Sequence, residues 1–111
     1  MVRLITRGRF THEYAKGLVA APEDREPAIK KLLEGVGAKL VNLYFTTGDS
    51  DFLLISEGDD AESVIAALLA TAAAGTISDI STARAWTGKE FKAVAEKASK
   101  AAKAYRAPGK H

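Results

Sequence analysis

The chain has 111 residues, of which 47% are hydrophobic and 27% are charged, a size and composition typical of one folded domain. Its 16 basic and 14 acidic residues leave a net charge of only +2, which argues against a nucleic-acid-binding protein, since those usually carry a large clustered basic excess. It has no cysteine, which excludes disulfides, thiolate catalysis and cysteine-ligated metals.

No stretch reaches the roughly 18 consecutive apolar residues that a membrane-spanning helix needs. The first residues also lack the apolar core and cleavage site of a signal peptide. We therefore expect a cytoplasmic protein with no membrane partner.

The N-terminal third is expected to contain a strand and a helix. Residues 2–10 alternate between two faces, which predicts a half-buried strand. A short helical turn follows near residues 11–19. A longer helix then opens at residues 21–25, because Pro22 and the acidic residues after it suit a first turn. Gly35 and Gly37 are expected to end this helix.

The central third is predicted to form a β-hairpin. Residues 39–46 and 51–57 are both rich in apolar residues and are joined by a turn that contains Gly48, Asp49 and Asp51. Gly48 is able to adopt a positive φ. Asp49 and Asp51 are expected to accept hydrogen bonds from backbone N–H groups rather than to bind a metal.

The C-terminal third is predicted to contain two helices and one strand. Asp60 is a suitable N-cap for a helix over residues 61–74, and a strand follows at residues 77–86. Thr87 and Glu90 have the spacing of a capping box, so a last helix is expected from there to about residue 105. We expect one domain over residues 1–105 and a flexible tail over residues 106–111.

The order β-α-β-β-α-β predicts a ferredoxin-like α+β fold, with a four-stranded antiparallel sheet and helices on one face. The last helix is additional to that plan. Strand alternation predicts that six large side chains lie on the uncovered face: Ile5, Tyr44, Phe52, Leu54, Ile80 and Trp86. A soluble monomer rarely exposes so much apolar surface, so we predict a homo-oligomer, a dimer or larger, whose sheets pack face to face. The alternative is that the last helix folds back over its own sheet.

A cluster of arginines is predicted on the same face. Its members are Arg3, Arg7, Arg9 and Arg84, near Tyr44 and Trp86. Guanidinium groups pair well with carboxylates and phosphates, which favours a site for a small anionic or aromatic ligand, with His12 at its edge. The alternative is that these arginines bridge acids across a subunit interface or extend into water at strand ends.

Few features favour an enzyme. The sequence has no phosphate-binding loop, and neither His12 nor His111 belongs to a metal-binding motif. Serine and threonine are the remaining nucleophiles, and no histidine–aspartate relay is evident beside them. We therefore expect no metal and no cofactor, and we lean against catalysis.

Several stretches resemble the GYD family of small bacterial proteins. They are residues 22–25, 37–40, 48–51, 82–85 and 105–109, and Ser50 stands where the family usually has an aromatic residue. The resemblance implies a ferredoxin-like fold and oligomers of the dimeric α/β-barrel type, without an established chemistry. By analogy of fold alone, one alternative is a monooxygenase-like enzyme, cofactor-free or haem-assisted, with Arg7, His12, Tyr44 and Trp86 around its pocket. Another is a purely structural or regulatory subunit.

Overall fold

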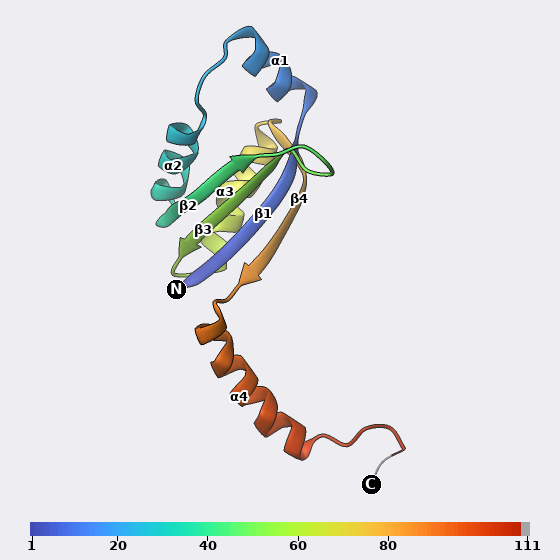
Figure 1. Ribbon diagram of the computed structural model, residues 1–111. Helices are drawn as coiled ribbons and strands as arrows, with labels where there is room; N and C mark the ends of the chain where they lie inside the picture. The colour runs from blue at the N-terminus through green and yellow to red at the C-terminus, as the bar shows by residue number, and fades with distance from the viewer. Residues whose placement is uncertain (110–111) are drawn as a thin grey trace.

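The computed structural model describes residues 1–109, which form a four-stranded antiparallel sheet and four helices. The elements are β1 (Val2–Phe10), α1 (His12–Ala20), α2 (Glu26–Gly35), β2 (Ala38–Phe45), β3 (Phe52–Gly58), α3 (Ala61–Ala73), β4 (Ile77–Ala85) and α4 (Gly88–Ala104). The strands lie in the order β2-β3-β1-β4 (Figure 1). This is the ferredoxin-like arrangement, so the predicted fold class is confirmed.

Two helix starts agree with the predicted caps. The Asp60 carboxylate accepts a hydrogen bond from the Ser63 backbone N–H at 2.8 Å and caps α3. The Thr87 hydroxyl and the Glu90 carboxylate each accept a backbone N–H from the other residue, at 3.1 and 2.7 Å, and so form the capping box of α4.

The first connection differs from the prediction. The expected helical turn is a nine-residue helix, α1, capped by the Thr11 hydroxyl. The next helix starts at Glu26, later than predicted, because residues 22–25 form a loop in which the Asp24 carboxylate accepts the Glu26 N–H at 2.9 Å.

The hairpin turn is joined to the end of β1. Gly48 has a φ of 93°, a conformation that costs glycine little. The Asp51 carboxylate accepts the Phe10 N–H at 2.8 Å, and the Asp51 N–H donates to the Gly8 carbonyl at 2.8 Å. The Asp51 carboxylate thus accepts a backbone N–H, but it joins the turn to β1 instead of bonding within the turn. Asp49 contributes only its backbone carbonyl, which lies 3.5 Å from an Arg9 Nη1.

The core lies between the sheet and helices α2 and α3. Its buried hydrophobic residues are Leu4, Leu33, Ala38, Phe52, Leu54, Val64, Ala67 and Leu68. Phe52 and Leu54 thus face the helices, and their predicted place on the uncovered face was wrong. Both faces of β3 are apolar, so alternation alone could not show which face lies against the helices. Phe52 and Leu54 pair with Gly8 and Thr6 of β1, and this register places them on the helix side.

A bulge in β4 moves other side chains. Arg7 pairs with Ser81 but Arg9 pairs with Ser78, so Asp79 and Ile80 together oppose Gly8, and Asp79 has a φ of 51°. As a result Ile77 and Ile80, three residues apart, both pack against the core. The predicted position of Ile80 on the uncovered face was therefore wrong.

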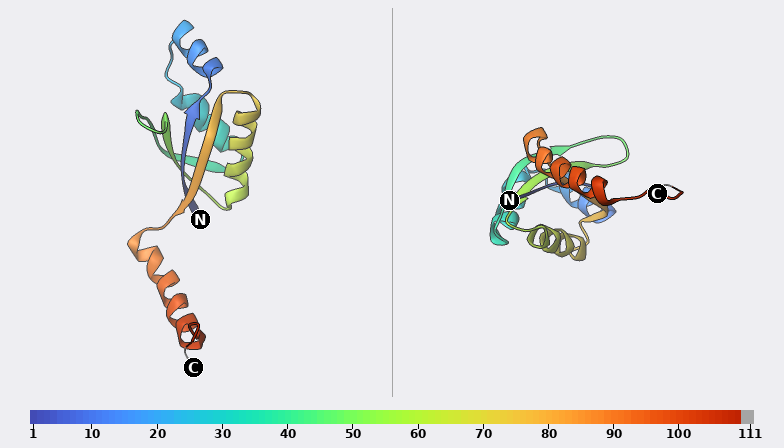
Figure 2. Two further views of the ribbon diagram at one scale, coloured as in Figure 1. Left: turned by 90° about the vertical axis from the view of Figure 1, so that its right-hand side faces the viewer. Right: turned by 90° about the horizontal axis from the view of Figure 1, so that it is seen from below.

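Helix α4 does not cover its own sheet. It leaves the lower end of the domain (Figures 1 and 2) and contains no buried residue. The radius of gyration is 18.3 Å, whereas a compact chain of this length would have about 13 Å. The alternative in which the last helix folds back over the sheet is therefore not the arrangement in this structure. Residues 106–109 of the predicted tail contain no helix or strand, and residues 110–111 lie outside the described part.

Gly8 allows the Phe52 ring to lie against β1. A Cβ at position 8 would lie 2.7 Å from Phe52 Cζ and 2.9 Å from its Cε1. We expect Gly8→Ala to lower the free energy of unfolding by about 1–3 kcal/mol, because the buried ring must move. Chemical denaturation would measure the change.

Gly17→Ala is the matched control, because nothing lies within 4 Å of a Cβ added there in α1. It should be neutral or stabilising by up to about 1 kcal/mol, the difference in helix propensity. Equal stability of the Gly8 variant and the wild type would contradict the packing described.

Candidate functional site

The face of the sheet turned toward the viewer in Figure 1 is covered by no element among residues 1–109. Directly paired residues on neighbouring strands project to the same face, so the register arranges this face in three rows. In the order β2, β3, β1, β4, they are Tyr44–Leu53–Arg7–Ser81, Asn42–Ile55–Ile5–Ala83 and Lys39–Glu57–Arg3–Ala85.

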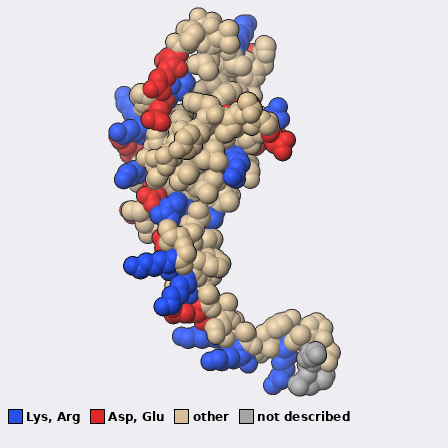
Figure 3. Space-filling view, viewed as in Figure 1, with Lys and Arg blue, Asp and Glu red and all other residues tan. Residues whose placement is uncertain are grey.

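The middle of this face is apolar and its ends are charged. Ile5, Leu53 and Ile55 are only half-buried, and Tyr44 is 56% exposed. Figure 3 shows the same side as a largely uncharged surface that has basic and acidic side chains around it. We call it the open face.

Arg3 is held by two carboxylates at one end of the open face. Its Nη2 lies 2.8 Å from Glu57 Oε2, and its Nη1 lies 2.9 Å from Glu90 Oε1 at the start of α4. Arg3 therefore links β1, β3 and α4 through its charge. Both Nη atoms of its guanidinium group already contact acids of the same chain.

Arg7, Arg9 and Tyr44 remain at the other end of the open face. Both arginines are exposed, and Arg7 shares a row with Tyr44. With Leu53 between them, the two backbones lie about 10 Å apart, two strand spacings. A ligand with an anionic group and an apolar or aromatic body would span that distance.

Arg84 and Trp86 are not part of this group. Arg84 pairs with Leu4, whose side chain is in the core, so it lies on the helix side of the sheet. Its Cζ lies 4.8 Å from the centroid of the Trp86 ring, which in turn packs edge-on against Phe91 at 5.7 Å. The predicted cluster of four arginines was therefore wrong, because the bulge in β4 reverses the alternation.

The remaining predicted residue, His12, is the exposed first residue of α1. His111 lies outside the described residues.

A model of the GYD domain family matches residues 4–95. The chain belongs to the GYD family. The match includes β1 from residue 4, the other three strands, helices α1 to α3 and the first half of α4, and it confirms the resemblance found in the sequence. No curated protein and no solved structure matches the chain.

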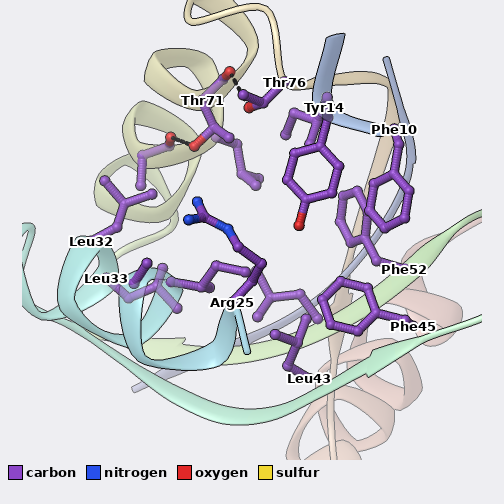
Figure 4. Close-up of a pocket in the computed structure, with 16 residues that line it drawn as sticks. Phe10, Tyr14, Arg25, Leu32, Leu33, Leu43, Phe45, Phe52, Thr71 and Thr76 are labelled. Carbon is purple, nitrogen blue, oxygen red and sulfur yellow. Dashed lines mark hydrogen bonds between the residues drawn. The ribbon is translucent and has the colours of Figure 1, made fainter. Parts of the chain in front are cut away.

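The GYD domain contains a pocket on the helix side of the sheet that sequence reasoning missed. It has a volume of about 120 Å³ and lies between α2, α3, the start of α1 and the upper ends of the strands (Figure 4). Its polar side chains are those of Tyr14, Arg25, Thr71 and Thr76. In the sequence, the only sign of this pocket is Arg25, a single arginine in the loop between α1 and α2. A single residue in a loop forms no periodic pattern that would indicate a binding site.

No helix in the described part of this GYD protein is long and apolar enough to span a membrane. Among residues 1–109, no three His, Cys, Asp or Glu side chains are grouped in a way that could hold a metal ion.

The contact between Arg3 and Glu90 affects the titration of both groups. The two carboxylates raise the pKa of Arg3, Glu90 more than Glu57. The pKa of Glu90 is lowered, first by the Thr87 backbone N–H and then by Arg3. The folded state favours the ionised form of Glu90. The contribution of this group to the free energy of unfolding is therefore complete above its unfolded pKa of about 4.3. It is lost as the pH falls through the lower pKa of the folded state.

We expect the Glu90 carboxyl, followed by NMR, to titrate with a midpoint below about 4.3, the ordinary value for glutamate. Arg3→Met should raise this midpoint only part of the way to the ordinary value, because the Thr87 N–H is the larger cause. A full return to the ordinary value, or no shift in the wild type, would contradict the geometry at the start of α4.

Proposed function

We propose that this GYD protein is a homo-oligomeric binding protein. Its copies pack through the open face, and a small anionic or aromatic ligand lies at the edge of the interface near Arg7, Arg9 and Tyr44. The observation that supports this most strongly is the middle row of the open face, where Ile5 and Ile55 have no cover from residues 1–109.

Burial of each large apolar side chain is worth about 1.5–3 kcal/mol. A second copy is the partner that this face suits best, because a two-fold axis through the middle row would place apolar side chains against apolar side chains. The charged rows at the two ends would then form a polar rim, as in other stable interfaces.

Helix α4 offers further surface for the same assembly. Its apolar stripe contains Phe91, Val94, Ala95, Ala98, Ala102 and Tyr105, none of which is buried. Phe91 and Tyr105 are 49% and 69% exposed. An amphipathic helix that projects from its own domain is expected to place such a stripe against a neighbouring copy.

The ligand part of the proposal depends on Arg7 and Arg9, neither of which forms an ion pair among residues 1–109. Arg7 and Arg9 lie on one strand, on the same face, beside an apolar surface. A guanidinium binds a carboxylate or phosphate through two parallel hydrogen bonds, and the neighbouring Tyr44 and Leu53 suit an apolar body. The cytoplasmic location expected from the sequence belongs to the same proposal.

Oligomer formation is tested by a charge in the middle row. Light scattering should give the wild type a mass of at least twice 11.8 kDa, and Ile55→Glu should give a folded monomer, because an unpaired buried carboxylate is strongly unfavourable in an interface. Leu69→Glu is the matched control, since Leu69 is 69% exposed on α3. It should keep the wild-type mass.

A wild-type mass of 11.8 kDa at tens of micromolar protein would contradict the open-face assembly. So would a loss of the oligomer in the Leu69 variant but not in the Ile55 variant, because it would place the interface on the helices.

Ligand binding at the open face is tested with phenyl phosphate, which has both an aromatic ring and a phosphate. We expect Arg7→Met and Arg9→Met each to weaken binding by about tenfold or more, the loss of a charge-assisted hydrogen bond. Arg84→Met is the matched control, because Arg84 lies on the other side of the sheet. Isothermal titration would measure the affinities.

Equal weakening by Arg84→Met would contradict this placement of the ligand. An intact oligomer that binds no phenyl phosphate would leave the open face as a purely structural interface.

A further inference from the structure

We infer that the pocket on the helix side of the sheet is a second binding site, and that it takes a small monocarboxylic acid with one ring or a short aliphatic chain. This inference does not depend on the proposed function, since the pocket and the open face lie on opposite sides of the sheet.

The volume of the pocket limits the size of the ligand. It is about 120 Å³, slightly less than an engineered apolar cavity of about 150 Å³ that binds benzene. One six-membered ring or a chain of a few carbons therefore fits, whereas a nucleotide or a long acyl chain does not.

The walls of the pocket are apolar. Four aromatic rings form one side of it, and Phe10 is central among them: its centroid lies 4.4 Å from that of Tyr14, 5.7 Å from Phe45 and 6.2 Å from Phe52. Leu32 and Leu33 of α2 lie across the pocket from these rings, and Leu43 of β2 lies beside Phe45 (Figure 4). Such a surface favours the hydrocarbon part of a ligand over water.

Arg25 supplies the charge. In Figure 4 its guanidinium projects into the pocket, and the Tyr14 hydroxyl points toward it. Its Nη1 donates to Glu23 Oε1 at 2.9 Å, whereas its Nε is buried and has no hydrogen-bond partner among residues 1–109. A buried donor without a partner is unfavourable, and the Nε edge of a guanidinium is suited to donate two parallel hydrogen bonds to a carboxylate.

The other polar side chains in the pocket are already satisfied. The Thr71 hydroxyl donates to the Ala67 carbonyl at 2.8 Å, and the Thr76 hydroxyl donates to the Thr71 carbonyl at 2.9 Å. Recognition of a polar group therefore falls to Arg25 and Tyr14. Because Glu23 already shares the charge of Arg25, a monoanion fits better than a phosphate dianion.

The test is a titration of the full chain with benzoate, with hexanoate as an aliphatic probe and benzyl alcohol as a neutral probe. We expect saturable binding of at least one of the two acids, at one site per chain. Arg25→Met should weaken binding of the acid by about tenfold or more and should change the affinity for benzyl alcohol little. Ala28→Phe, which fills the pocket from α2, should weaken all three.

Lys30→Met, which removes an exposed cation from the same helix, is the matched control and should bind as the wild type does. If Arg25→Met fails to fold, as judged by circular dichroism, Arg25→Lys should still bind the acid, but more weakly than the wild type. Failure of both acids to bind, or equal affinity in the folded Arg25→Met protein, would overturn the inference. Arg25→Met should keep the oligomer mass of the wild type, so failure here is distinguishable from failure of the open-face interface.

Discussion

The two central strands, β1 and β3, carry apolar side chains on both faces, and the chain covers only one of those faces. On the helix side, Leu4, Phe52 and Leu54 are buried under α2 and α3. On the other side, Ile5, Leu53 and Ile55 have no such cover among residues 1–109. Because burial of apolar surface is the main favourable term in folding and association, this asymmetry is the basis of the proposed contact between copies. Helix α4 extends away from the domain, and none of its residues is buried.

Backbone irregularities decide which side chains reach each face. The shift between Leu40 and Asn42 in β2 lets Leu40 and Leu43 both pack against the core while Tyr44 stays on the open face. The bulge at Asp79 has the same effect in β4 and moves Arg84 to the helix side. Each bulge changes the face on which the later side chains of its own strand lie, and it leaves the other strands unchanged. The three arginines on the open face, Arg3, Arg7 and Arg9, are all on β1, which pairs with β3 on one side and β4 on the other.

Arginines serve three distinct purposes in this small domain. Arg3 is structural, since its ion pairs with Glu57 and Glu90 fix the start of α4 against the sheet. Arg84 lies over Trp86 and supports the junction between β4 and α4. Arg7 and Arg9 are exposed and form no ion pair among residues 1–109, and Arg25 has one acid partner, Glu23. They lie on opposite sides of the sheet and mark the two places where an anion would meet apolar surface.

The sequence by itself determined the elements, their order and most of their boundaries, because caps such as Asp60 and Thr87, the turn at Gly48 and the period of the apolar residues are local signals. It also indicated the GYD family. The tertiary structure decided which face each side chain occupies, since a β3 strand that is apolar on both sides has no preferred face until it pairs with β1, and a single bulge reverses everything beyond it. The pocket around Arg25 was likewise decided only in three dimensions, because its walls come from α1, α2, α3 and all four strands, which are distant in the sequence.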